Sequence, residues 1–123
     1  MRIRKAKPLY IKFLKKIGLG VDSLNLGVTL WTLLLILHIL ACFWGTSASF
    51  NLSSNQNWIF KAGIQDESVT SKYVTCLYWA SYTVITVGYG DIIPQNSYET
   101  LLACAVFLLG VALFSYSLST LAN

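Results

Sequence analysis

Two long stretches without charged side chains constrain this chain more than any other feature. One lies between Asp22 and Lys61, and the other covers residues 100–123. A helix over residues 24–48 or 100–123, rising about 1.5 Å per residue, is long enough to cross a hydrocarbon core of about 30 Å. Only 11% of all residues are charged, against about 25% in soluble domains. We therefore expect an integral membrane protein with two spanning helices.

The basic residues are concentrated before the first apolar stretch. Residues 1–22 carry seven Lys or Arg against Asp22, and the remaining residues sum to −2. A signal peptide is the alternative, but its apolar region spans about 7 to 15 residues, fewer than residues 24–48 provide. A basic block directly before a span is also unlike a nucleic-acid-binding face. The positive-inside rule predicts that both termini are cytoplasmic, most simply at the cell membrane.

Residues 1–20 have the pattern of a helix that lies along the membrane surface. Apolar residues recur at helical spacing, while lysines occupy another face. The alternative is a solvated basic anchor without a further role. The apolar face comprises Leu9, Phe13, Leu14 and Ile17, and the basic face comprises Lys12, Lys15 and Lys16.

The connection between the two spans has two parts. Residues 49–70 are rich in Asn, Ser and Gln and predict an exposed outer loop, in which Asn51 begins an N-glycosylation tripeptide. Residues 73–85 are apolar and aromatic, and Thr70 or Ser71 could cap a helix there. Thirteen residues are too few to cross a membrane. This segment is therefore expected to enter the membrane and turn back.

The five residues after this short helix are Thr86-Val87-Gly88-Tyr89-Gly90, followed by Asp91. A Gly-Tyr-Gly tripeptide alone could be a tight turn, but TVGYG is the filter sequence of potassium channels. From residue 24 to residue 123, the chain resembles the pore module of tetrameric potassium channels. The resemblance implies an all-α membrane protein with an outer helix (24–48), a re-entrant pore helix (73–85), a filter (86–90) and an inner helix (99–123). Residues 1–20 would be a linker, and residues 21–123 the pore domain.

The filter sequence suits a dehydrated potassium ion because carbonyl oxygens can replace its water shell. Gly88 and Gly90 can adopt positive φ, which allows successive carbonyls to face one axis. The resemblance assigns potassium coordination to the carbonyls of residues 86–89, helped by the Thr86 hydroxyl. One chain supplies one wall only, so three further copies or homologous subunits are expected. Potassium would be the permeant ion, and no other cofactor is implied.

Three residues are expected to support the filter. In similar channels an aromatic residue of the pore helix bonds the Asp that follows the filter. The matching pair here is Tyr78 and Asp91, with Trp79 packed beside Tyr78. The alternative is ordinary interfacial aromatic packing.

The inner helix contains the expected cavity and gate. Gly110 is either a hinge or a small residue that permits close helix packing. Helical spacing places five residues on one face that would line the cavity or gate: Val111, Phe114, Ser115, Leu118 and Ala122.

The outer helix carries His38, Ala41-Cys42 and Trp44, which is similar to the ether-à-go-go and cyclic-nucleotide-gated branch of the voltage-gated-like superfamily. Glu99 also fits this branch, whereas Leu118-Ser119-Thr120 departs from it. The resemblance implies that voltage-sensor or cyclic-nucleotide-binding regions would flank this segment in a longer protein. His38 is either functional or a neutral side chain that bonds a neighbouring helix.

The sequence therefore predicts a potassium-selective channel pore and not an enzyme. One alternative is a weakly selective cation pore. Another is a structural or regulatory membrane subunit that keeps the fold without conducting. Thr86 and Asp91 argue against weak selectivity, and no cluster of a nucleophile with an acid and a base supports catalysis.

Overall fold

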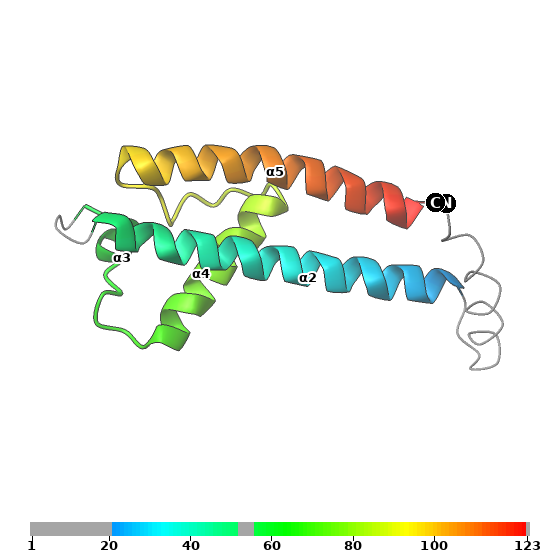
Figure 1. The fold of residues 1–123 in the computed structure, drawn as a ribbon, viewed down its shortest axis with the longest axis horizontal. Coiled ribbons are helices and arrows are strands. Elements are labelled where there is room, and N and C mark those ends of the chain that lie inside the picture. Colours follow the sequence, from blue (N-terminus) through cyan, green and yellow to red (C-terminus); the bar gives the residue numbers. More distant parts are fainter. Residues whose placement is uncertain (1–20, 52–55, 123) are drawn as a thin grey trace.

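The computed structural model describes residues 21–51 and 56–122, and these ranges contain helices and no strand. The linker helix expected in residues 1–20, residue 123 and most of the glycosylation tripeptide at Asn51 lie outside the described residues. Figure 1 shows the arrangement of the elements along the chain. They are α2 (Val21–Ser47), a 3-10 turn η2 (Ala48–Asn51), α3 (Trp58–Lys61), α4 (Val69–Val84) and α5 (Ser97–Ala122).

Helices α2 and α5 are the two long elements, and they lie side by side (Figure 1). Both are apolar around their whole circumference, so apolar side chains such as Leu34 and Leu108 remain exposed. Residues Ser23–Phe50 and Ser97–Thr120 are long and apolar enough to cross a membrane. The predicted all-α membrane fold with two spans is confirmed.

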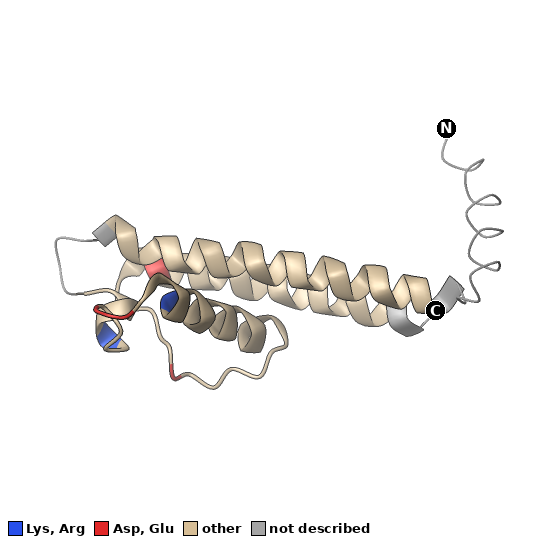
Figure 2. Cartoon of the chain, turned by 90° about the horizontal axis from the view of Figure 1, so that it is seen from below, with Lys and Arg blue, Asp and Glu red and all other residues tan. Residues whose placement is uncertain are grey.

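Charged side chains gather at one end of the described structure. Figure 2 shows them on α3, near the start of α4 and on the connecting loops, while most of the length of α2 and α5 carries none. Solvation of charge is favourable in water and costly in hydrocarbon. This end is therefore the one that projects beyond the apolar layer, and α4 runs inward from it.

Helix α4 is the short helix predicted between the spans, and it packs against both α2 and α5. It begins at Val69, four residues before the predicted start at 73, because the hydroxyl of Ser68 accepts a hydrogen bond from the Ser71 N–H at 3.2 Å. Ser68, rather than Thr70 or Ser71, is thus the cap. The 16 residues of α4 span about 24 Å. This is shorter than the hydrocarbon core.

The expected outer loop contains a short helix that the sequence did not predict. Helix α3 begins after Asn57, whose side-chain oxygen accepts a hydrogen bond from the Phe60 N–H at 2.9 Å. Its first residue, Trp58, is buried and donates its indole N–H to the Trp44 carbonyl at 3.1 Å. The loop is thereby tied to the end of α2.

Three stacked tryptophans form the centre of the core at this end. The Trp44 ring lies 3.9 Å from the Trp79 ring and 5.5 Å from the Trp58 ring, between centroids. All three side chains are buried. Because Trp44 belongs to α2, Trp58 to α3 and Trp79 to α4, the stack fixes these three elements relative to one another.

Candidate functional site

The TVGYG segment follows the inner end of α4 and has an alternating backbone conformation. Gly88 and Gly90 have φ values of 63° and 72°, the conformation for which the sequence analysis expected glycine. Thr86 has a φ of 62° as well, which the sequence did not predict. Left-handed backbone is strained for a β-branched residue. The surrounding structure must therefore hold Thr86 in place.

The N–H groups of this segment are bonded to the end of α4. The Tyr82 carbonyl accepts from the Val87 N–H at 2.9 Å and from the Gly88 N–H at 3.3 Å, and the Thr83 carbonyl accepts from the Thr86 N–H at 3.1 Å. Within the described residues, the carbonyls of residues 86–89 accept no hydrogen bond. The segment thus offers uncommitted carbonyl oxygens, which are ligands suited to a hard, dehydrated cation.

The predicted contact between Tyr78 and Asp91 is present in the structure. The Tyr78 hydroxyl donates to Asp91 Oδ2 at 2.9 Å, while Oδ1 accepts from the Ile92 N–H at 3.1 Å. These bonds link the middle of α4 to Asp91, the residue that directly follows the filter. A carboxylate held by two donors is restricted in orientation, and so is the backbone that carries it.

Tyr82 is a second aromatic support that the sequence analysis missed. Its hydroxyl donates to the Ile92 carbonyl at 3.2 Å, and its ring meets the Tyr78 ring edge-on at 5.0 Å. A sequence signal for it existed, because residues four apart share one helix face. Tyr78 and Tyr82 therefore present two hydroxyls to the same outgoing segment.

Hydrogen bonding shifts the pKa values of this cluster. Partial burial raises the pKa of Asp91, but hydrogen bonds, above all from the Tyr78 hydroxyl, outweigh this and leave the pKa below its ordinary value. The hydrogen bond to Asp91 raises the pKa of Tyr78. Burial, followed by the charge of Asp91, raises the pKa of Tyr82. At neutral pH the cluster therefore holds an ionised carboxylate and two neutral phenols.

Trp79 was expected to pack beside Tyr78, and this contact stays a prediction. The Trp79 indole stacks on Trp44 of α2, and it also borders a cavity of about 370 Å³ between the filter and α5. Phe107, which the sequence analysis did not single out, lines this cavity one turn before Val111. The cavity also reaches Tyr82, Thr83, Thr86, Gly88, Gly90 and the residues Ile92, Ile93 and Pro94.

The side chains of Val87 and Tyr89 are exposed, at 52% and 68% of their surface. The Tyr89 ring approaches Tyr82 edge-on at 5.7 Å and lies parallel to the Tyr78 ring at 6.3 Å. Large exposed side chains at the filter are consistent with a surface that other subunits cover.

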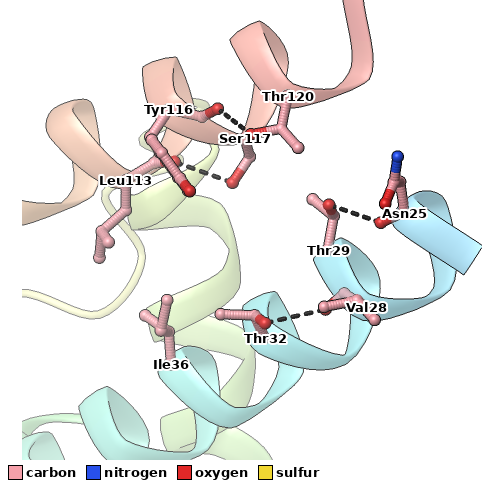
Figure 3. A pocket seen from close by; sticks show the side chains of 9 residues that line it. All are labelled: Asn25, Val28, Thr29, Thr32, Ile36, Leu113, Tyr116, Ser117 and Thr120. Carbon is pink, nitrogen blue, oxygen red and sulfur yellow. Dashed lines mark hydrogen bonds between the residues drawn. The ribbon is translucent and has the colours of Figure 1, made fainter. Parts of the chain in front are cut away.

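One face of α5 is turned toward α2 across a separate cavity of about 200 Å³ (Figure 3). The hydroxyls there donate to carbonyls of their own helices, as Thr32 does to Val28 and Ser117 does to Leu113, both at 2.8 Å. The residues of α5 that line it are Leu113, Tyr116, Ser117 and Thr120.

The predicted lining residues of α5 are not among those that face α2. Val111, Ser115 and Leu118 are exposed, and Phe114 is half-buried. Ala122 is the last residue of α5, and its side chain lies outside the description. Only Val111 meets the filter cavity. Within one chain, the structure therefore brings one of the five residues to the filter.

Gly110 is buried at the crossing of α5 and α4. A Cβ atom at this position would lie 3.3 Å from the Val84 Cα, which is backbone and therefore hard to displace. The contact favours the close-packing interpretation of Gly110. A hinge at this residue stays a prediction.

His38 bonds a neighbouring helix, which was the simpler of its two interpretations. Its Nδ1 lies 2.7 Å from the Tyr73 hydroxyl of α4. Cys42, Cys76 and Cys104 are free, and no group of three or more His, Cys, Asp or Glu suited to a metal occurs in the described ranges.

Two spanning helices, a re-entrant helix and a segment of uncommitted carbonyls together define a membrane channel pore. A family model described as "Ion channel" matches residues 28–123. The chain belongs to this family and corresponds to its pore domain, as predicted, and it is a channel rather than an enzyme.

Similar proteins include plant channels that are much longer than this chain. "Potassium channel AKT1" of Arabidopsis thaliana is 28% identical over 99% of this chain and 14% of its own length. "Potassium channel KAT4" of Oryza sativa subsp. japonica is 31% identical over 99% of this chain and 21% of its own length. "Potassium channel KAT6" of the same subspecies is 29% identical, with the same two coverages. The chain thus spans about a fifth or less of these relatives.

Proposed function

We propose that this chain forms a potassium-selective pore, in which four copies place residues 86–90 around a common axis. The observation that carries the proposal is the TVGYG backbone, with positive φ at alternate residues and carbonyls free of hydrogen bonds. The relatives described as potassium channels support the same ion. The cell membrane, with both termini cytoplasmic, is the proposed location.

Conduction would use the backbone as a substitute for water. An ion entering the filter exchanges its water shell for rings of carbonyl oxygens from residues 86–89, and the Thr86 hydroxyl completes the inner end. Ions in adjacent sites lie close enough to repel one another, and this repulsion moves the row of ions forward through the filter. Bonds from Tyr78 to Asp91 and from Tyr82 to Ile92 keep the outer end of the filter at a fixed width.

Helix α4 would add an electrostatic contribution at the inner side. The C-terminal end of a helix carries about half a unit of negative charge from its aligned peptide dipoles. Four such ends around one axis favour a cation without an acidic side chain. Because Ile85 and the filter follow directly after Val84, the helix end and the ion path are close together.

The test is the reversal potential of the reconstituted chain between potassium on one side and sodium on the other. A potassium-selective pore shifts this potential by about 59 mV for each tenfold change in the potassium gradient, because a decade corresponds to about 1.4 kcal/mol and a charge gains about 2.3 kcal/mol per 100 mV. A value near zero with robust current would establish a weakly selective pore instead. A silent but assembled complex would indicate a non-conducting subunit.

A further inference from the structure

Glu99 is a buried carboxylate at the start of α5, and the filter mechanism does not use it. None of its surface is exposed, and no ion pair joins it to a basic side chain of the described residues. An ionised carboxylate removed from water is costly unless hydrogen bonds replace the lost solvation.

The two oxygens of Glu99 bond two segments that are far apart in the sequence. Oε1 accepts from the Trp58 N–H of α3 at 3.3 Å, and Oε2 accepts from the Gln95 N–H at 2.8 Å. Asn96 reinforces the same junction, because its side-chain oxygen accepts from the Glu99 N–H at 2.9 Å and its amide donates to the Gln56 carbonyl at 3.0 Å. The first turn of α5 and the residue before it are thus hydrogen-bonded to both the outer loop and the segment that follows the filter.

Both bonded segments lead to the filter support. Gln95 stands four residues after Asp91, whose carboxylate bonds Tyr78. Trp58 belongs to the tryptophan stack that reaches Trp79 on α4. Glu99 therefore connects the outgoing end of the filter to the core that fixes the pore helix.

We propose that Glu99 is a positioning residue for the outer mouth of the pore, acting through a carboxyl group whose two oxygens both accept backbone hydrogen bonds. It holds the Gln95 backbone against α3 and so limits widening of the filter end at Asp91. This inference rests on the proposed function, since its consequence is how long an open pore continues to conduct.

The chemistry of the carboxylate makes the proposal specific. Both partners of Glu99 are backbone donors, so the site needs two acceptors and no donor. Glutamine has the same shape but supplies one acceptor and an NH₂ group. Glu99→Gln would therefore leave either the Trp58 or the Gln95 N–H facing another donor in a buried place. Glu99→Asp retains acceptor-only chemistry with a shorter reach.

The experiment compares amide hydrogen exchange and sustained potassium current in the assembled full chain, for the unaltered protein, Glu99→Gln and Glu99→Asp. For Glu99→Gln we expect exchange at Trp58 and Gln95 about tenfold faster, and loss of current during sustained opening faster by about the same factor. In Glu99→Asp, the exchange rates and the rate of current loss should lie between those of the unaltered protein and those of Glu99→Gln. Asp66→Asn, at an exposed carboxylate, is the control and should change neither rate.

Three results would overturn the inference. Unchanged exchange at both amides in Glu99→Gln would show that the carboxylate does not hold these segments. Faster exchange with unchanged decay of the current would reduce Glu99 to a structural role. Decay in Glu99→Asp as fast as in Glu99→Gln would exclude the acceptor chemistry. Absence of potassium current in the unaltered chain would instead overturn the proposed function. The exchange data would still show whether Glu99 holds the Trp58 and Gln95 N–H groups.

Discussion

Individual backbone conformations carry most of the chemistry of this pore. Gly63, in the outer loop, and Gly88, in the filter, have nearly equal φ values of 70° and 63°, and both have open space where a Cβ would stand. The cost of alanine at either place is therefore conformational rather than steric, on the order of 1–2 kcal/mol. The two glycines differ in location alone, which makes them a matched pair.

We expect Gly88→Ala and Gly63→Ala to lower thermal stability by similar amounts. Gly88→Ala should also abolish potassium-selective current, whereas Gly63→Ala should leave the reversal potential unchanged. The reason is that rotation of the filter backbone turns a carbonyl away from the ion path. Measurement of melting temperature together with reversal potential separates the two effects. Selective current in Gly88→Ala would show that the filter does not need this conformation.

The bond between Tyr78 and Asp91 predicts a specific pH dependence. The pKa of Asp91 is lowered from 3.8, so its contribution is complete above the ordinary value and is lost as pH falls through the lowered pKa. The pKa of Tyr78 is raised from 10.0, so its contribution is complete below pH 10.0 and is lost as pH rises through the raised pKa. Tyr78→Phe should therefore speed the loss of conduction equally between pH 3.8 and pH 10.0, the ordinary pKa values of the two groups. Records of current decay against external pH test this expectation, and a slope near neutrality would contradict it.

At the level of elements, the contact between α5 and α4 decides the position of the filter. Gly110 and Gly27 are both helical glycines, but a Cβ at Gly27 meets nothing within 4 Å, whereas at Gly110 it meets the Val84 backbone. Val84 is the last residue of α4 before the filter. A displacement at this crossing would therefore move the start of the TVGYG segment.

We expect Gly27→Ala to be neutral or stabilising by up to about 1 kcal/mol, because alanine is the better helix former. Gly110→Ala gains the same propensity but must push α4 away, so current should fall although the protein still assembles. Single-channel recording and native mass of both variants form the test. Normal current in Gly110→Ala would show that α5 can shift to accommodate a methyl group.

The elements were predictable from the sequence to the extent that they depend on local pattern. The uncharged stretches predicted both spans, and the resemblance to potassium-channel pores predicted the bond from Tyr78 to Asp91. The cap at Ser68, helix α3 and the burial of Glu99 were missed, because each depends on a particular partner atom. The contact between Trp58 and Glu99, for example, joins residues 41 positions apart.

At the level of the whole molecule, one chain leaves much of its apolar surface without a partner. Tyr89 at the filter and Leu34 on the outer helix α2 are 68% and 59% exposed. A lipid-facing residue stays exposed to hydrocarbon after assembly, whereas a residue beside the axis becomes covered by another copy. The two positions are therefore expected to respond differently to truncation.

We expect the detergent-extracted chain to have a native mass of four times 13.7 kDa. Tyr89→Ala should weaken assembly at least tenfold, because a buried aromatic ring contributes more than about 1.4 kcal/mol. Leu34→Ala should leave the mass distribution unchanged. Native mass spectrometry over a dilution series gives both results, and a dominant single copy would contradict the fourfold arrangement.

The bonding of N–H groups of the TVGYG segment to α4 also bears on which ions the proposed pore would admit. Chloride is held in proteins by N–H and O–H donors, and the carbonyls of Tyr82 and Thr83 have already taken those of residues 86–88. What the backbone of residues 86–88 still offers is carbonyl oxygens, which repel an anion. We therefore expect the proposed pore to reject chloride without a ring of acidic side chains, because α4 has taken the N–H donors of residues 86–88.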